Sequence, residues 1–254
     1  MISRPPRNHV SRINNAFYAD LGDRWFEGDE HAVALLRAEA GIKVRYTLEV
    51  FERLGIGPGA RVLDVACGAG LVAFPLAGRG YRVKGVDLAE GAIETARRQT
   101  PEGVDATFAV ADAYATGEPA GAYDAVLLLD MLEHVERPAD VLCEAARVAR
   151  PGGAVVFHTF NRTPEAWLLA IHGMKVVARD TPEHVHVYEL FIRPSELRAM
   201  AREAGLDVKE VRGVRPVVDR ALWWSVVRRR VHPGFRFTFA RVPRVGYAGY
   251  AVKG

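Results

Sequence analysis

The sequence is poor in cysteine and has no long uncharged apolar run. Its 254 residues include two cysteines, Cys67 and Cys143, which lack metal-ligand spacing and are too few for a disulfide framework. A disulfide-bridged secreted domain is therefore excluded. No stretch approaches the roughly 18 apolar residues of a membrane span, and the basic start lacks the apolar core of a secretory signal. We expect a cytoplasmic protein.

The chain also lacks a strong charge of either sign. Lys plus Arg number 34 against 31 for Asp plus Glu, whereas a dedicated nucleic-acid binder carries a large basic surplus. We therefore expect no nucleic-acid partner. The length suits one domain with additions better than two ordinary domains.

What is present is an alternation of strand-like and helix-like segments, which predicts a parallel sheet covered by helices. Residues 1–10 predict a flexible tail, and residues 11–254 predict a single domain. Within it, residues 11–54 predict a helical cover that ends at Gly55, because apolar residues recur there every three or four positions. Residues 154–159 predict the fifth strand.

Two later segments interrupt this rhythm. Residues 161–193 predict an inserted lid, and residues 219–244 predict a second insertion that contains Trp223 and Trp224. In the lid, residues 164–179 form an amphipathic helical pattern. Such a helix fits a peripheral contact with the inner face of the membrane and fits equally a cover over a pocket.

The most informative motif follows the first strand and reads Asp64-Val-Ala-Cys-Gly68-Ala-Gly70. The glycines allow a tight turn and close approach of a ligand, and the next helix offers free N–H groups to it. With Ala73 the motif also satisfies G-x-G-x-x-A, so a dinucleotide oxidoreductase stays open as an alternative.

Three aspartates refine this interpretation. Asp64 ends the first strand, where a carboxylate can order the loop or meet a cationic ligand. Asp87 ends the second strand and suits two ribose hydroxyls. Asp112 follows the third strand, where it can accept an adenine N–H while the amide of Ala113 meets a ring nitrogen. Each aspartate could instead cap the following helix.

Together these residues resemble the class I S-adenosylmethionine-dependent methyltransferases. The resemblance implies an α/β, Rossmann-like fold with a seven-stranded, mostly parallel sheet whose last strand is antiparallel. It also implies that S-adenosylmethionine is the cofactor.

The segment Leu129-Asp130-Met131-Leu132-Glu133-His134-Val135 ends the fourth strand, at the sheet edge where ligands bind in such folds. His134, with Glu133 beside it, could act as a general base on a phenolic proton. Asp130, Glu133 and His134 could instead bind one divalent ion such as Mg²⁺. The third possibility is that Glu133 and His134 only cap the next turn.

This segment, together with His158 to Arg162, Trp167-Leu and Phe191 to Leu197, resembles the ubiquinone-biosynthesis O-methyltransferases. That family implies a phenolic, catecholic or lipid-like quinone precursor as acceptor, and a metal held by Asp130, Glu133 and His134. The candidate cofactor contacts are Arg45, Asp64, Ala66, Gly68, Gly70, Asp87, Leu88, Asp112, Ala113 and Leu129.

Two departures accompany the resemblance. The stretch Leu36 to Gly41 differs from the family's segment before its cofactor-binding arginine, and the chain from Val218 onward matches no typical member. A small-molecule N- or C-methyltransferase therefore remains an alternative, as does a non-catalytic cofactor-binding protein associated with a membrane.

Overall fold

The computed structural model describes residues 14–254, so the tail predicted for residues 1–10 lies outside the described part. Helix α1 (Val33–Leu54) follows two short 3-10 helices, η1 (Asn15–Tyr18) and η2 (Gly22–Trp25). It ends where Gly55 takes the left-handed conformation with φ 67°, a conformation that glycine adopts readily. Of the helical cover expected for residues 11–54, the described part (residues 14–54) consists of one long helix and two single turns.

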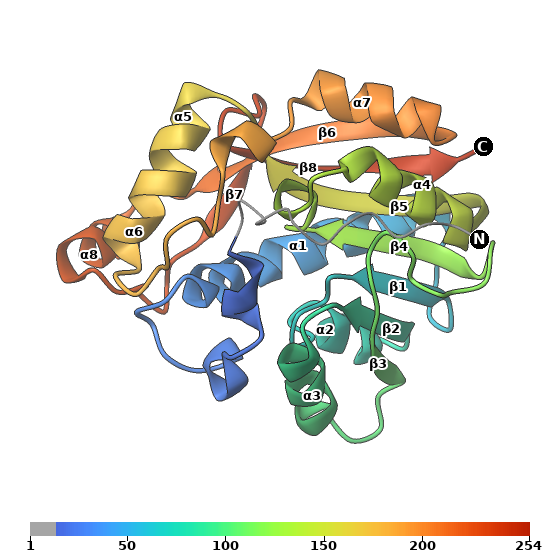
Figure 1. The fold of residues 1–254 in the computed structure, drawn as a ribbon, viewed down its shortest axis with the longest axis horizontal. Helices are drawn as coiled ribbons and strands as arrows, with labels where there is room; N and C mark the ends of the chain where they lie inside the picture. The colour runs from blue at the N-terminus through green and yellow to red at the C-terminus, as the bar shows by residue number, and fades with distance from the viewer. Residues whose placement is uncertain (1–13) are drawn as a thin grey trace, which may run out of the picture.

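The central sheet is built from β1 (Arg61–Val65), β2 (Arg82–Asp87), β3 (Ala106–Val110), β4 (Tyr123–Leu129), β5 (Ala149–Phe160), β6 (Leu206–Pro216), β7 (Phe237–Ala240) and β8 (Gly246–Lys253). The spatial order is β3-β2-β1-β4-β5-β8-β6-β7. Neighbouring strands from β3 to β5 run parallel, and β8 joins β5 and β6 antiparallel to both. The predicted mostly parallel α/β sheet is confirmed (Figure 1).

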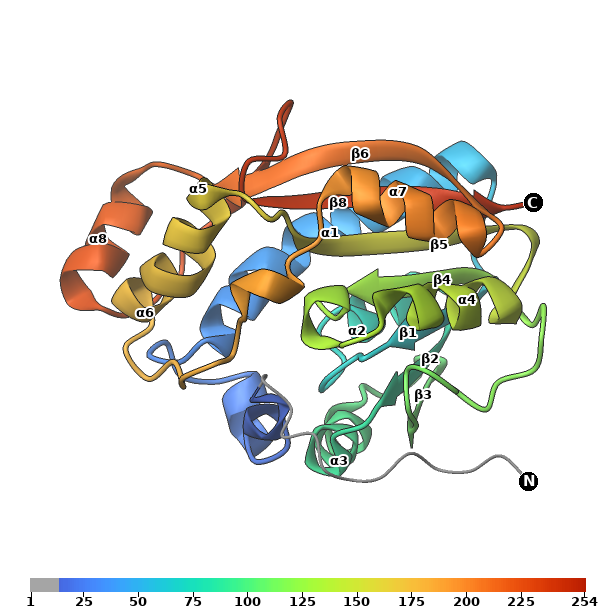
Figure 2. The same ribbon diagram turned by 45° about the horizontal axis from the view of Figure 1, so that its top comes forward.

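Helices cover both faces of this sheet. On one face α1, α2 (Ala73–Ala77) and α3 (Glu90–Gln99) contribute to one buried cluster. On the other face α4 (Pro138–Val148) and α7 (Pro194–Glu203) contribute to a second cluster. Figure 2 shows α4 and α7 in front of the sheet and α1 behind it.

The sheet differs from the expectation in two places. It has eight strands rather than seven, because β7 forms at the edge of the sheet within residues 219–244, which we expected to be an insertion only. Strand β5 is also longer than the predicted 154–159 and begins directly after α4. A four-residue edge strand such as β7 carries too few apolar positions to show a clear alternation in sequence.

The two segments that interrupt the alternation, residues 161–193 and 219–244, also contain helices. Residues 164–177 are helical throughout, as α5 (Pro164–Ala166), the π-helix η4 (Trp167–Gly173) and α6 (Met174–Val177), and η5 (Tyr188–Leu190) precedes α7. Within residues 219–244, α8 (Arg220–Arg228) follows its N-cap residue Asp219, whose carboxylate accepts the N–H groups of Ala221 and Leu222. Segments α6 and α8 are in contact, and both views place them at the same end of the molecule (Figures 1 and 2).

The order of the strands reverses direction between β1 and β4, because β2 and β3 follow β1 on one side and β5 follows β4 on the other. In sheets of this kind ligands bind beyond the carboxyl ends of the strands at the reversal. The aspartates and the Leu129–His134 segment follow these strand ends, so the fold brings them to one edge.

Replacement of Gly249 in β8 should destabilise the sheet. A Cβ atom there would lie 2.4 Å from the Phe157 ring and 2.5 Å from the Glu210 carbonyl oxygen. We expect Gly249→Ala to lower the free energy of unfolding by about 1–3 kcal/mol, the usual cost of overpacking. Urea denaturation measures this change.

The matched control is Gly41→Ala in the middle of α1, where an added Cβ meets nothing within 4 Å. Alanine is favoured over glycine in a helix by about 0.5–1 kcal/mol, so this variant should be at least as stable as the wild type. Equal urea midpoints for Gly249→Ala and the wild type would contradict the packing at β8.

Candidate active site

A cavity of about 780 Å³ opens at the carboxyl ends of β1, β2, β3 and β4. This volume suits a small-molecule ligand with an adenosine-sized group. Ten of the predicted site residues line it: Asp64, Ala66, Gly68, Asp87, Leu88, Asp112, Ala113, Leu129, Asp130 and His134. The residues selected from separate parts of the sequence thus surround one space.

The glycine loop is ordered by the carboxylate of Asp87. Its Oδ2 accepts the N–H of Gly68 at 2.8 Å, and its Oδ1 accepts the N–H of Ala89 at 2.9 Å. Gly68 has φ 54°, and a Cβ there would lie 2.5 Å from the indole of Trp25. Only glycine fits this position without displacing the indole, so the loop can approach a ligand closely.

The cavity wall carries the carboxyl groups of Asp64, Asp87 and Asp112. Asp64 is only 3% exposed, and burial followed by the nearby charge of Asp87 raises the pKa of its carboxyl to about 7, against the opposing charge of Lys43. Burial also raises the pKa of Asp87. A cationic ligand group would relieve this repulsion and favour the charged carboxylates.

The capping alternative accounts for part of the geometry. Asp87 accepts a backbone N–H at the start of α3, and Asp112 accepts the N–H of Tyr114 at 2.9 Å. A carboxylate has several acceptor positions, so both groups can hold the backbone and still meet a ligand. No helix lies between β3 and β4, so Asp112 holds a turn and does not cap a helix as Asp87 does. Both carboxylates also line the cavity, so these backbone contacts are compatible with ligand binding.

At the end of β4 a buried ionic network surrounds Asp130, a residue with φ 54°. Lys43 from α1 donates to Asp130 Oδ2, and His158 Nδ1 from β5 pairs with Oδ1. Glu39 lies 3.0 Å from Lys43 Nζ and 3.5 Å from His158 Nε2. Lys43 and His158 outweigh burial and lower the pKa of Asp130, so this carboxylate is ionised.

The predicted metal set Asp130, Glu133 and His134 does not come together as one ligand group. Within residues 14–254 the structure brings together two other sets, Glu133 with His134 and His186, and Asp130 with Glu39 and His158. Both oxygens of Asp130 already have cationic partners. The predicted trio therefore does not fit a metal ion in this structure.

Glu133 is not among the residues that line the cavity. It is fully buried, and its Oε2 accepts the Thr159 hydroxyl at 2.6 Å. Burial, with the charge of Asp130 in addition, raises the pKa of Glu133 to about 7. His134, which does line the cavity, contacts the rings of Tyr18 and His186.

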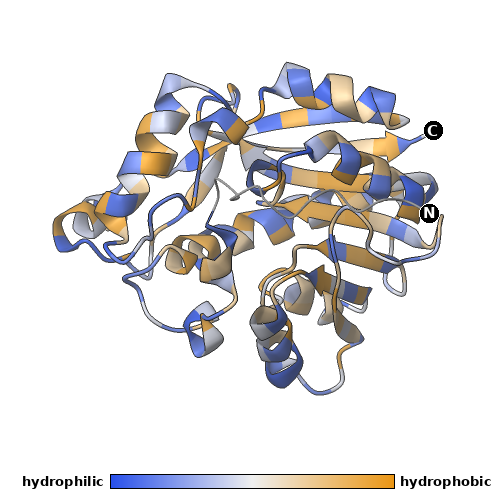
Figure 3. Cartoon of the chain, in the orientation of Figure 1, coloured by the Kyte–Doolittle hydropathy of each residue, from blue (hydrophilic) through white to orange (hydrophobic). Residues whose placement is uncertain are grey.

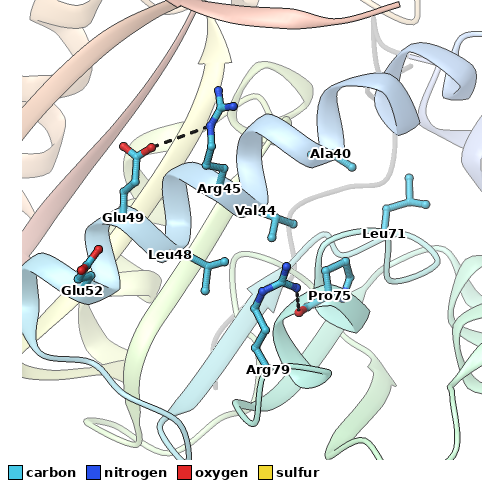
Figure 4. Close-up of a pocket in the computed structure, with 10 residues that line it drawn as sticks. Ala40, Val44, Arg45, Leu48, Glu49, Glu52, Leu71, Pro75 and Arg79 are labelled. Atoms are coloured by element: carbon cyan, nitrogen blue, oxygen red, sulfur yellow. Dashed lines mark hydrogen bonds and ion pairs between the residues drawn. The ribbon is translucent and has the colours of Figure 1, made fainter. Parts of the chain in front are cut away.

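The placement predicted for Arg45 is wrong. Its side chain is 60% exposed, lies 3.9 Å from Glu49 and stacks over Phe239. It borders a different pocket of about 470 Å³, between α1 and the segment that carries Leu71, Pro75 and Arg79 (Figure 4). Successive helical residues turn by about 100°, so Lys43, two positions earlier, faces the opposite way. Lys43 lines the main cavity.

Gly70 also lies off the cavity wall; an added Cβ there would meet the rings of Phe74 and Phe108. Several wall residues were not predicted: Tyr18 and Trp25 from the 3-10 helices, Leu36, Ala40 and Lys43 from α1, and Met131 after β4. The spacing of Leu36, Ala40 and Lys43 is a signal that could have been used, since these positions share one helical face.

The comparisons with known proteins agree with this geometry. Residues 63–157 match the family described as a methyltransferase domain. A ubiquinone biosynthesis O-methyltransferase from Thiobacillus denitrificans is 37% identical over 210 residues, which cover 82% of this chain and 88% of the relative. Another from Burkholderia pseudomallei is 43% identical over 160 residues, covering 62% and 68%.

Solved structures show the same fold. A putative methyltransferase from Haloferax volcanii, solved with its Trm112 activator, aligns with a TM-score of 0.61 at 18% identity over 96% of this chain and 97% of its own. The magnesium protoporphyrin IX methyltransferase of Synechocystis aligns with a TM-score of 0.58 at 19% identity, covering 83% and 82%. With relatives this similar over most of its length, the chain belongs to the family of ubiquinone biosynthesis O-methyltransferases.

Proposed function

We propose that this methyltransferase transfers a methyl group from S-adenosylmethionine to a hydroxyl on the phenolic or catecholic ring of a quinone precursor. The observation that carries the proposal is the convergence of the glycine loop, Asp87, Asp112 and His134 on one cavity in a chain of this family. Family membership favours an oxygen acceptor over the amine or carbon acceptors of other small-molecule methyltransferases.

The wall of the cavity divides into parts suited to different groups of the cofactor. Asp87, fixed by the N–H groups of Gly68 and Ala89, is placed to accept ribose hydroxyls, and Asp112 to accept an adenine N–H. Asp64 supplies negative charge beside the loop, which suits the sulfonium and amino groups. Lys43, in place of Arg45, is the basic side chain on this wall.

The chemistry asks the protein for alignment and for removal of one proton. In an in-line displacement the acceptor oxygen bonds to the methyl carbon as the carbon–sulfur bond breaks, and the hydroxyl proton leaves. Alignment comes from holding both reactants in one enclosed site. We assign proton removal to the pair formed by Glu133 and His134, because His134 lines the cavity and the adjacent Glu133 is a buried carboxyl group whose pKa is raised to about 7.

Asp87→Asn should weaken binding of the product S-adenosylhomocysteine about 10- to 100-fold. The change removes the charge that holds the loop and the ribose, and a hydrogen bond to a charged group contributes about 1.5–3 kcal/mol. Isothermal titration calorimetry measures the affinity.

Asp105→Asn is the control for this experiment. Asp105 is 66% exposed before β3 and pairs only loosely with Arg82, at 3.7 Å, so its replacement should leave the affinity unchanged. An Asp87→Asn variant that binds the product as tightly as the wild type would refute the assignment of the ribose site.

His134→Ala should lower turnover about 10²- to 10⁴-fold, the range expected for loss of a proton-transfer group, with product affinity preserved. Burial and the neighbouring His186 lower the pKa of His134 to about 3, so the imidazole stays neutral above about pH 4. The wild-type pH–rate profile should therefore show no inflection near 6.5 from this residue. Steady-state assays with an alkyl catechol measure the turnover of the variant and the pH–rate profile of the wild type. Unchanged turnover would reduce His134 to a packing role.

We further propose that one end of the molecule contacts an anionic lipid surface, which would give access to a lipid-like acceptor. The described residues contain no helix long and apolar enough to span a bilayer. Hydrophobic residues nevertheless recur along the α5–α6 segment and α8 (Figure 3), and several of their side chains are exposed. They are Trp167, Leu168, Leu169, Val176, Trp223, Trp224 and Val227.

Basic residues accompany this apolar surface. Arg220, Arg228 and Arg229 are exposed on α8 and at its end, and each basic group near anionic lipid adds about 1 kcal/mol of attraction. Trp223 is 61% and Val227 77% exposed, a large apolar area to leave in water without a partner.

The double variant Trp223→Ser with Val227→Ser should bind vesicles containing phosphatidylglycerol at least tenfold more weakly, because burying each apolar side chain contributes about 1.5–3 kcal/mol. Flotation measures the bound fraction. Val242→Ser, at a 56% exposed residue outside these helices, is the control and should bind as the wild type does. Wild-type protein that stays unbound at low salt would refute the lipid contact.

A further inference from the structure

Tyr18 lies on the cavity wall beside the pair of residues proposed to remove the proton. It is the last residue of η1, is half-buried, and lines the cavity together with Trp25. Its ring stacks on the Trp25 indole with the ring centroids 5.9 Å apart, and it meets the His134 imidazole edge-on at 5.8 Å. The phenol ring is therefore held between the glycine-loop side of the cavity and His134.

The segment that carries Tyr18 is fixed at both ends. The side-chain amide of Asn15 donates to the carbonyl oxygen of His134 at 3.1 Å. Further along, Arg98 from α3 donates to the carboxylate of Asp23 at 2.7 Å. These bonds tie η1 to the turn after β4 and η2 to α3. The Tyr18 side chain is thus placed before any ligand binds, as an effective hydrogen-bond donor in an active site should be.

The hydroxyl of Tyr18 is a neutral donor among acidic groups. A tyrosine hydroxyl is protonated near neutral pH in any case, and burial, followed by the charges of Asp130, Glu133 and Asp87, raises the pKa of Tyr18 further. Within residues 14–254 this hydroxyl makes no hydrogen bond. Asp87 belongs to the proposed ribose site and Glu133 to the proposed proton-removing pair, so the hydroxyl lies near the place where cofactor and acceptor must meet.

Other donors on this part of the wall are occupied or buried. The ammonium group of Lys43 donates to Asp130, and the amide of Asn15 is bonded to a backbone carbonyl. The indole N–H of Trp25 is buried. An acceptor oxygen that loses its proton gains negative charge beside several carboxylates. It therefore needs a donor that is not already paired, and the Tyr18 hydroxyl meets this requirement.

We propose that the Tyr18 hydroxyl donates a hydrogen bond to the attacking oxygen of the acceptor and stabilises the negative charge that develops there. This inference rests on the proposed function and assigns a further residue to that reaction. The acceptor proton passes to the pair of Glu133 and His134, and the oxygen then bonds to the methyl carbon. The electron pair of the broken carbon–sulfur bond stays on sulfur, and Tyr18 keeps its own proton throughout.

Tyr18→Phe tests the proposal, because it removes the hydroxyl and keeps the ring that packs against Trp25 and His134. Turnover on an alkyl catechol should fall about 10- to 100-fold, the effect of losing one hydrogen bond to a charged group. The affinity for S-adenosylhomocysteine, measured by calorimetry, should not change. The loss of turnover should be smaller on a nitrocatechol, whose less basic oxygen is a weaker hydrogen-bond acceptor. A role in packing alone would lower turnover on both catechols equally.

Tyr81→Phe is the matched control. Tyr81 precedes β2, at the end of the strand opposite the cavity, and its hydroxyl donates to the carbonyl oxygen of Ile56 at 3.2 Å. This variant also loses a tyrosine hydroxyl, and it should keep wild-type turnover on both catechols.

Three results for Tyr18→Phe would overturn the assignment and leave the proposed function standing. They are wild-type turnover, an equal loss on the two catechols, and a matching loss of affinity for S-adenosylhomocysteine, which would place the hydroxyl on the cofactor. A wild-type protein that binds S-adenosylhomocysteine but methylates neither catechol would refute the proposed function, and the role of Tyr18 with it.

Discussion

The ionised carboxylate of Asp130 is the constraint on which the site depends. Asp130 directly follows β4 in a left-handed conformation and is held by Lys43 from α1 and His158 from β5. Breaking a buried ion pair by removing one partner costs about 3–5 kcal/mol, so α1 is fixed against the sheet edge at this point. The position of α1 in turn places Leu36, Ala40 and Lys43 on the cavity wall.

The ion pairs of Asp130 determine which polar side chains near the cavity are left without a partner. With both oxygens of Asp130 committed, the buried polar atoms of the same segment that lack a hydrogen-bond partner among the described residues are Oε1 of Glu133 and Nδ1 of His134, about one turn further along the chain. The wall itself carries Asp64, Asp87 and Asp112, and burial raises the pKa of the first two. Such a wall favours a cationic ligand, because the ligand's charge offsets the repulsion among the carboxylates. A sulfonium cofactor has this property, and a dinucleotide with a pyrophosphate does not.

The sequence was sufficient for features that depend on local order. A strand followed by a glycine turn fixes where Asp64 and Gly68 lie, and the ends of parallel strands bring Asp87, Asp112 and His134 to the same edge. The sequence was insufficient where the direction in which a helical side chain points determines whether it lines the cavity. Lys43 and Arg45 are two residues apart, yet one lines the cavity and the other faces outward. Contacts across the lid, such as that of His186 with His134, have no local signal at all.

The two segments that interrupt the α/β rhythm act together with the N-terminal cover. The guanidinium group of Arg230, just after α8, forms ion pairs with the carboxylates of Asp29 and Glu30, just before α1. The nitrogen–oxygen distances are 2.8 and 3.3 Å. Glu30 also pairs with Arg179 after α6, and its carbonyl oxygen accepts the N–H of Asp180.

Ala34, Ala178, Val231 and Phe235 form a small buried cluster beneath these ion pairs. The N-terminal cover, the segment 161–193 and the segment 219–244 therefore meet in one assembly, at the end of the molecule that carries α6 and α8. The helix that carries Lys43 into the cavity begins within that assembly, so the surface proposed to meet lipid and the wall of the cavity are parts of one packed unit.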